Sequence, residues 1–208
     1  MSLSTFFYNQ ARKPSGLFGK IFMSVIFNKG NKTLNTFVYE LLSVEKNDRI
    51  FEIGFGTGRL MNKIAGKIED GCIQGTDFSE AMVSLARKRN KKHIQDGKIK
   101  LFMADFDNMP VEKELFTKIC SINTLYFWKD PLQTTKKIMK MLNPGGKLIL
   151  AFEDIIQLRQ RKVDENILHL YTKEEVVDIL VNAGFKGGVT VQSRNKNDLV
   201  FHCAVAIK

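Results

Sequence analysis

The chain has 208 residues, of which 44% are hydrophobic and 26% are charged, and its formal net charge is +10. This composition is typical of a globular protein with a sizeable core and excludes a disordered chain. No run approaches the roughly 18 apolar residues of a membrane-spanning helix. Cys72, Cys120 and Cys203 are widely spaced, which predicts neither a disulfide framework nor a zinc site. We therefore expect a cytoplasmic protein without a bound metal.

The segment from Leu17 to Asn28 is predicted to form a helix that is apolar over most of its surface. Its only polar residues, Lys20, Ser24 and Asn28, fall on one stripe with a spacing of four. Such a helix must be covered. We interpret residues 1–46 as an N-terminal helical segment that lies over a binding site as a lid. The alternative is that it lies in a membrane interface as a peripheral contact.

A glycine-rich turn occupies the stretch FEIGFGTGRL, from Phe51 to Leu60. The apolar residues before the turn predict a strand, and the apolar spacing after it predicts an amphipathic helix. Gly54, Gly56 and Gly58 are each two residues apart. Because glycine permits positive φ and lets a ligand approach the main chain, this arrangement predicts a binding loop.

A dinucleotide is the first candidate ligand, because its fingerprint G-x-G-x-x-G occurs in the same strand, turn and helix context. Here Arg59 stands where the third dinucleotide glycine would be. Glu52, near the end of the strand, would also repel a pyrophosphate bound at the helix N-terminus. A ligand with an ammonium group and no phosphate suits the loop better, and S-adenosylmethionine is such a ligand.

Strand-like and helix-like segments alternate along the rest of the chain, which predicts parallel strands joined by crossover helices. One helix begins at the N-cap Ser79, and the next has Asp130 as N-cap, apolar residues up to Leu142 and Gly145 near its C-terminus. Thr172 and Glu175 form a capping box before a later helix. Strands are predicted before and between these helices and as a final hairpin, at residues 50–53, 72–77, 99–104, 116–124, 147–152, 189–192 and 199–207.

Several motifs in the right order resemble the class I S-adenosylmethionine-dependent methyltransferases. The run from Glu52 to Gly58 resembles the first motif of that family, 142–148 its loop before the fifth strand, and 183–185 its usual helix end. The resemblance covers residues 47–208, and within the family the chain resembles the ubiquinone/menaquinone-methyltransferase branch. It implies an α/β fold: a Rossmann-like, doubly wound sheet of seven strands, mostly parallel with an antiparallel last strand.

The resemblance also implies which residues hold S-adenosyl-L-methionine, beyond the ends of the strands. Asp77 is expected to accept hydrogen bonds from the ribose hydroxyls, and Phe78 to pack on the adenine or else in the core. Asp105 is expected to receive the adenine amine or to act as a loop cap, and Phe106 to offer a backbone N–H. Asn123, Thr124 and Leu125 are expected to border the methionine part and the transferred methyl. Glu52 is expected near the ammonium, and the loop of Gly54, Gly56 and Gly58 is expected to hold the cofactor.

Methyl transfer is an in-line displacement, so the protein mainly has to align nucleophile, methyl and sulfur and to exclude water. A general base is needed only if the acceptor retains its proton. Tyr126, His169 and Tyr171 are the candidates for that base, and a structural role is the alternative for each. We therefore assign no catalytic residue from the sequence.

The acceptor is expected to be a small molecule, apolar acceptors included. The Asn/Asp-Pro-Pro-aromatic signature of nucleic-acid amino-methyltransferases and the Pro-Cys pair of cytosine-5 enzymes are both missing, since the fourth strand ends SINTLYF. A lipid or quinone acceptor would suit a membrane-interface segment. One alternative is an RNA methyltransferase that uses the stretch 87–100, which contains seven basic residues and one acidic residue. The other is a non-catalytic protein that binds S-adenosylmethionine.

Overall fold

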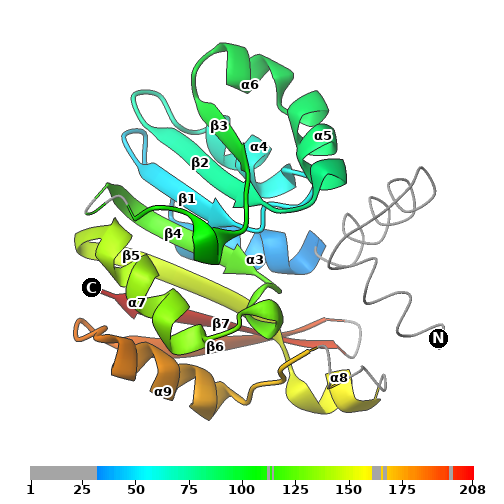
Figure 1. The fold of residues 1–208 in the computed structure, drawn as a ribbon, viewed down its shortest axis with the longest axis vertical. Helices are drawn as coiled ribbons and strands as arrows, with labels where there is room; N and C mark the ends of the chain where they lie inside the picture. Colours follow the sequence, from blue (N-terminus) through cyan, green and yellow to red (C-terminus); the bar gives the residue numbers. More distant parts are fainter. Residues whose placement is uncertain (1–31, 112, 114, 161–164, 166–167, 197–198) are drawn as a thin grey trace.

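The computed structural model describes residues 32–111, 113, 115–160, 165, 168–196 and 199–208. Within these residues, seven strands form one sheet in the order β3-β2-β1-β4-β5-β7-β6 (Figure 1). Strands β1 to β5 are parallel to one another, and β7 is antiparallel to both β5 and β6. This confirms the predicted fold class, including the antiparallel last strand. The strands are β1 (Arg49–Ile53), β2 (Cys72–Asp77), β3 (Ile99–Met103), β4 (Phe116–Ile122), β5 (Leu142–Glu153), β6 (Val189–Lys196) and β7 (Leu199–Ile207).

Helices cover both faces of the sheet. Successive strand residues point to opposite faces, so in β1 Ile50 belongs to the core beneath α3, α4 and α5, while Phe51 belongs to the core beneath α7 and α9. No described helix is long and apolar enough to cross a membrane. The described helices are α3 (Lys32–Leu42), α4 (Arg59–Ala65), α5 (Glu80–Arg89), α6 (Lys91–Gln95), α7 (Pro131–Met141), α8 (Ile155–Gln160) and α9 (Lys173–Ala183), with 3-10 turns η1 (Phe106–Asn108) and η2 (Leu125–Phe127).

The predicted helix starts are confirmed by the hydrogen bonds of their caps. The Ser79 side chain accepts from the N–H of Met82 at the start of α5, and Asp130 accepts from the N–H of Gln133 at the start of α7. Thr172 and Glu175 form the reciprocal capping box of α9. These contacts satisfy N–H groups that the first turn of a helix leaves without intrahelical partners.

One predicted boundary is wrong. The fifth strand, expected from residue 147, already begins at Leu142, and the preceding helix, whose apolar pattern includes Leu142, ends at Met141. Leu142 pairs with Phe116 of β4, and the N–H of Gly145 donates to the carbonyl of Lys208 at 3.2 Å. Pro144 has no N–H to donate in a helical hydrogen bond, which disfavours a helix in this segment. Strand pairing with β4 therefore determines its structure.

Helix α3 lies against the sheet rather than apart from it. Its Leu34, Phe37, Val38 and Leu42 are buried in the core that also contains residues of α4 and β5. Residues 1–31, with the apolar segment 17–28, lie outside the described residues. The predicted lid, and the division of the chain at residue 46, therefore stay predictions.

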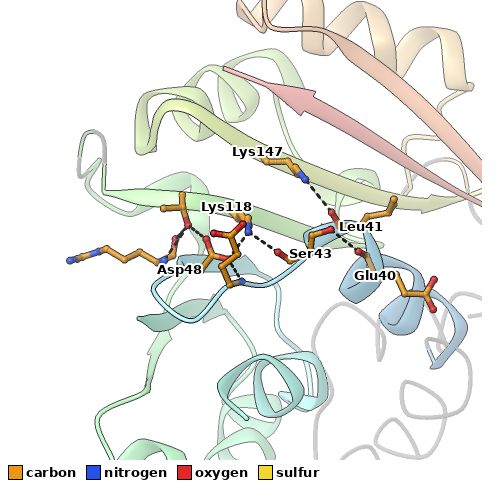
Figure 2. A network of polar contacts seen from close by, with 9 residues as sticks. Glu40, Leu41, Ser43, Asp48, Lys118 and Lys147 are labelled. Atoms are coloured by element: carbon orange, nitrogen blue, oxygen red, sulfur yellow. Dashed lines mark hydrogen bonds and ion pairs between the residues drawn. The ribbon is translucent and has the colours of Figure 1, made fainter. Parts of the chain in front are cut away.

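A buried ion pair holds the segment after α3 to β4 (Figure 2). Asp48 accepts hydrogen bonds from the Glu45 N–H at 2.7 Å, from Thr117 Oγ1 at 2.7 Å and from Lys118 Nζ at 2.5 Å. Lys118 Nζ also donates to the carbonyl of Ser43 at 3.0 Å. Burial alone would raise the pKa of Asp48, but these donors hold it below its usual value. The pair lies at the amino ends of the strands, opposite the glycine-rich loop.

Replacing Asp48 with Asn should destabilise the protein by about 3 to 5 kcal/mol, because Lys118 would keep a buried charge without its partner. Since the folded-state pKa of Asp48 is depressed, its contribution is present above its unfolded pKa of about 3.9 and is lost as the pH falls further. Urea unfolding at pH 7 and pH 3 should therefore show a smaller difference between wild type and Asp48→Asn at pH 3.

The matched control is Glu69→Gln, which breaks the exposed Lys46–Glu69 pair. That change should cost less than about 1 kcal/mol at either pH. Equal losses for the two variants at pH 7 would show that the Asp48–Lys118 pair has no special role in stability.

Candidate active site

The three glycines of the loop between β1 and α4 all have positive φ, at 69°, 53° and 68°. A Cβ atom at Gly54 would lie 2.4 Å from Thr124 Cγ2, and one at Gly58 would lie 2.6 Å from Asn90 Nδ2. The N–H of Gly54 donates to the carbonyl of Thr76 at 2.8 Å, which holds the loop beside the end of β2. Both backbone conformation and lack of space therefore require glycine at Gly54 and Gly58.

The end of α5 supports this loop from outside. Arg89 Nη1 donates to the carbonyl of Thr57 at 2.6 Å, and Asn90 Nδ2 donates to the carbonyl of Gly58 at 3.1 Å. Asn90 is fully buried. Sequence reasoning missed both residues, because a separation of 32 positions carries no local pattern and the arginine belongs to the basic stretch 87–100.

Two buried carboxylates lie beside the loop. Asp77, the last residue of β2, accepts hydrogen bonds from the N–H of Gly56 at 2.8 Å and from the N–H of Ser79 at 2.9 Å. Burial raises the pKa of Asp77 to about 6, although these two donors act in the opposite direction. Burial, together with the nearby charge of Asp77, raises the pKa of Glu52 well above its usual value.

One carboxylate oxygen of Glu52 lacks a hydrogen-bond donor among the described residues. This atom, Oε2, is buried. A buried acceptor without a donor is costly, and an ammonium group of a ligand would relieve that cost. The residues present therefore fit a cofactor with an amino-acid end.

A cavity of about 280 Å³ connects these groups at the carboxyl ends of the strands. Nine of the eleven predicted cofactor contacts line it, and Gly58 and Leu125 do not. Phe78 lies on the wall and is 42% exposed, which places it in the site rather than the core. The nine are Glu52, Gly54, Gly56, Asp77, Phe78, Asp105, Phe106, Asn123 and Thr124.

Asp105 has the loop-cap role and also lies on the cavity wall, while its contact with the adenine amine stays a prediction. It lines the cavity, and its side chain caps η1 by accepting from the N–H of Asp107 at 3.1 Å and from Asn108 Nδ2 at 3.3 Å. Phe106, next to it, is buried and also lines the cavity. The turn after β3 therefore brings the Asp105 carboxylate and Phe106 to the cavity wall.

The segment after β4 has an unusual backbone. Asn123 has a φ of 56°, a conformation that asparagine adopts more readily than most other residues. Thr124 follows it and shares a short hydrogen bond with Ser121 through their hydroxyl groups. Asn123 and Thr124 both line the cavity, as predicted for the methionine end, whereas Leu125 is fully buried in the core and is not among the lining residues.

The cavity also has lining residues that the sequence did not single out for it. Asn35 comes from α3, Arg59 begins α4, and Phe127, Trp128 and Lys129 follow β4. Apart from Arg59, which follows the glycine loop, no sequence motif marks them, because they come together only in the folded chain.

The three candidate bases lie elsewhere. Tyr126 is buried, and its hydroxyl accepts a hydrogen bond from the N–H of Glu153 at 2.6 Å. His169 is exposed and donates through its backbone N–H to the carbonyl of Tyr126 at 3.1 Å. Tyr171 is half-buried against the core. None of the three is among the described residues that line the cavity, so a catalytic role for them stays a prediction.

A search for metal ligands over the described part of the chain finds no group of three or more His, Cys, Asp or Glu side chains arranged to hold an ion.

Comparison with known proteins indicates which reaction this site supports. Residues 50–146 match the family described as "Methyltransferase domain". An uncharacterized methyltransferase, YdaC of Bacillus subtilis, is 28% identical over 178 residues, which are 86% of this chain and 93% of that protein. A ubiquinone/menaquinone biosynthesis C-methyltransferase, UbiE of Geotalea daltonii, is 25% identical over 121 residues, which are 58% of this chain and 52% of that protein.

A solved structure has the same fold. The phosphoethanolamine N-methyltransferase 2 of Haemonchus contortus, in complex with phosphomonomethylethanolamine and S-adenosylhomocysteine, superposes with a TM-score of 0.69 at 16% identity. The alignment covers 85% of this chain and 52% of that chain. The solved structure shows the same fold, the domain match and the YdaC homologue indicate methyl transfer, and the Glu52 carboxylate oxygen that the described residues leave unpaired fits a cofactor with an ammonium group; the chain is an S-adenosylmethionine-dependent methyltransferase.

Proposed function

We propose that the acceptor of the methyl group is a small molecule, apolar acceptors included. The observation that carries this proposal is the aromatic part of the cavity wall. Phe127 and Trp128 line the same cavity as the cofactor residues, although the predicted cofactor contacts do not involve them. A pocket with aromatic walls and a few polar groups is typical of sites for small molecules.

The residues of the chain divide the work of the reaction. When bound, S-adenosylmethionine supplies a methyl group on a positively charged sulfur. Glu52 would hold the ammonium end, Asp77 the ribose hydroxyls, and Asp105 with the Phe106 N–H the adenine. The rigid glycine loop and the Asn123 turn would orient the acceptor's nucleophile and exclude water. Transfer to the acceptor's nucleophile would leave the electrons of the broken carbon–sulfur bond on sulfur, and an acceptor proton would leave to solvent or to a base.

Replacing Asp77 with Ala should weaken binding of S-adenosylmethionine by about 1 to 3 kcal/mol, because the ribose hydroxyls would lose a charged acceptor. The pKa of about 6 adds a pH dependence. Below that pH the carboxyl is protonated, so wild-type affinity should rise with pH through about 6 and then level off. Calorimetry at several pH values checks both parts.

Asp70→Ala is the matched control for this experiment, because Asp70 is exposed just before β2 whereas Asp77 ends that strand. It should leave the affinity and its pH profile unchanged. A profile of Asp77→Ala that matches the wild type would show that Asp77 does not contact the cofactor.

The acceptor is best tested by a screen with the cofactor labelled on its methyl group. Quinones, lipids and other small molecules should be tested beside total RNA, with NAD as a binding control that we expect to fail. Transfer to a small molecule supports the proposal. The similarity to a quinone C-methyltransferase makes quinones the first class to test, and it supports the quinone branch only as a proposal.

The RNA alternative predicts transfer to RNA that is lost when basic residues are neutralised. Arg87 and Lys88 are the residues to change, because Arg89 holds the glycine loop and its loss would disturb the cofactor site. Tight cofactor binding without turnover on any acceptor would instead favour a non-catalytic binding protein.

A further inference from the structure

Helix α7 holds the turn that carries Asp105 and Phe106. Lys137, on α7, donates hydrogen bonds to the carbonyls of Phe106, of Asp107 at 3.2 Å and of Met109 at 2.6 Å. Its ammonium also lies over the Phe106 ring, 4.7 Å from the centroid. One side chain therefore binds three carbonyls of a single turn.

A second contact comes from the preceding turn of the same helix. Thr134 is buried, and its hydroxyl donates to Asp107 Oδ1 at 2.7 Å. Asp107 in turn donates its backbone N–H to the side chain of Asp105. The chain of contacts runs from α7 through Asp107 to the carboxylate that lines the cavity.

Removing the Lys137 ammonium from water costs free energy, which indicates that the arrangement has a functional role. Burial lowers the pKa of Lys137, although the carboxylates of Asp107 and Asp105 act in the opposite direction. The β3 to β4 connection contains only the short turn η1 among its described residues, so no helix of its own stiffens it. A loop without regular structure needs outside contacts if it is to read a ligand precisely.

We propose that Lys137 is a positioning residue that makes the enzyme selective for the adenine of its cofactor. By fixing the turn 105–109 it sets the Asp105 carboxylate and the Phe106 N–H at the positions where the exocyclic amine and the ring of adenine are read. This inference rests on the cofactor site described above. It goes beyond that site because Lys137 itself is not among the residues that line the cavity.

The test compares two forms of the demethylated product, S-adenosyl-L-homocysteine and S-inosyl-L-homocysteine. The second has a carbonyl where adenine has its amine, so Asp105 would lose a donor and face an acceptor. Calorimetry should show that the wild type prefers the adenine form by about tenfold or more. In Lys137→Met this preference should fall to about twofold or less, because the turn loses its three carbonyl contacts.

Two further variants separate positioning from general stability. Lys137→Arg keeps a cationic donor and should restore most of the preference. Lys140→Met removes an exposed lysine from the same helix and should leave it unchanged. Thr134→Val, which removes only the hydroxyl bond to Asp107, should lower the preference to a smaller extent and carries the test if Lys137→Met does not fold.

The outcomes are distinct. A wild-type preference retained in Lys137→Met, or in Thr134→Val where the first variant does not fold, would overturn the inference. So would a wild type that binds both compounds equally well. Failure of the wild type to bind S-adenosyl-L-homocysteine at all would overturn the cofactor site as well, which marks it as a different failure.

Discussion

Gly54→Ala should lower the affinity for S-adenosylmethionine more than about 100-fold. The new Cβ would lie 2.4 Å from Thr124 Cγ2, and the residue would have to keep a φ of 69°. Thr124 has little freedom to move, because its hydroxyl is bonded to Ser121. Either the glycine loop or the Asn123 turn must therefore shift, and both line the cavity. Equilibrium binding of the cofactor measures the effect.

Gly97→Ala is the control for backbone strain alone. Gly97 has a φ of 74°, and a Cβ there would meet no atom within 4 Å. It should cost about 1 kcal/mol of stability and leave cofactor affinity unchanged, since Gly97 is not among the residues that line the cavity. Affinity of Gly54→Ala within tenfold of the wild type would show that the loop does not need the observed close approach.

Deleting residues 1–28 should abolish methyl transfer while leaving cofactor affinity within about tenfold, or roughly 1.4 kcal/mol. The apolar segment 17–28 predicts a cover, and Asn35 of the helix that follows lines the cavity. The described residues that line the cofactor end all follow residue 31 and would remain. Turnover with an identified acceptor, and binding of a dye that detects apolar surface, are the measurements.

The truncated protein can fail this prediction in two informative ways. Full methyl transfer to the acceptor would refute the lid. Loss only of binding to liposomes, with turnover intact, would point to the membrane-interface alternative for the N-terminal segment. A substitution of Lys20 by Ala in the full chain serves as a control, because it changes the polar stripe without removing the apolar surface.

The sequence by itself determined the features whose physical cause is local. Three glycines at alternate positions permit the positive φ that the binding loop adopts, and Ser79, Asp130 and Thr172 cap helices that begin within three residues. Alternation of strands and helices then leads to a parallel sheet with its ligand site at the carboxyl ends. This is why the fold class could be predicted, and why nine of the eleven predicted cofactor contacts line the cavity.

Only the tertiary structure decided what depends on contacts between distant segments. Helix α7 ends before Leu142, and Leu142 joins β5, because pairing with β4 stabilises the strand there more than the apolar spacing stabilises a helix. Arg89, Asn90 and Lys137 bind the site's loops from 28 to 32 positions away, and no periodicity encodes such contacts. The sequence could not show that the Tyr126 hydroxyl accepts a hydrogen bond from the backbone N–H of Glu153. The direction in which a side chain points at the end of a strand is set by packing, which is a property of the whole sheet.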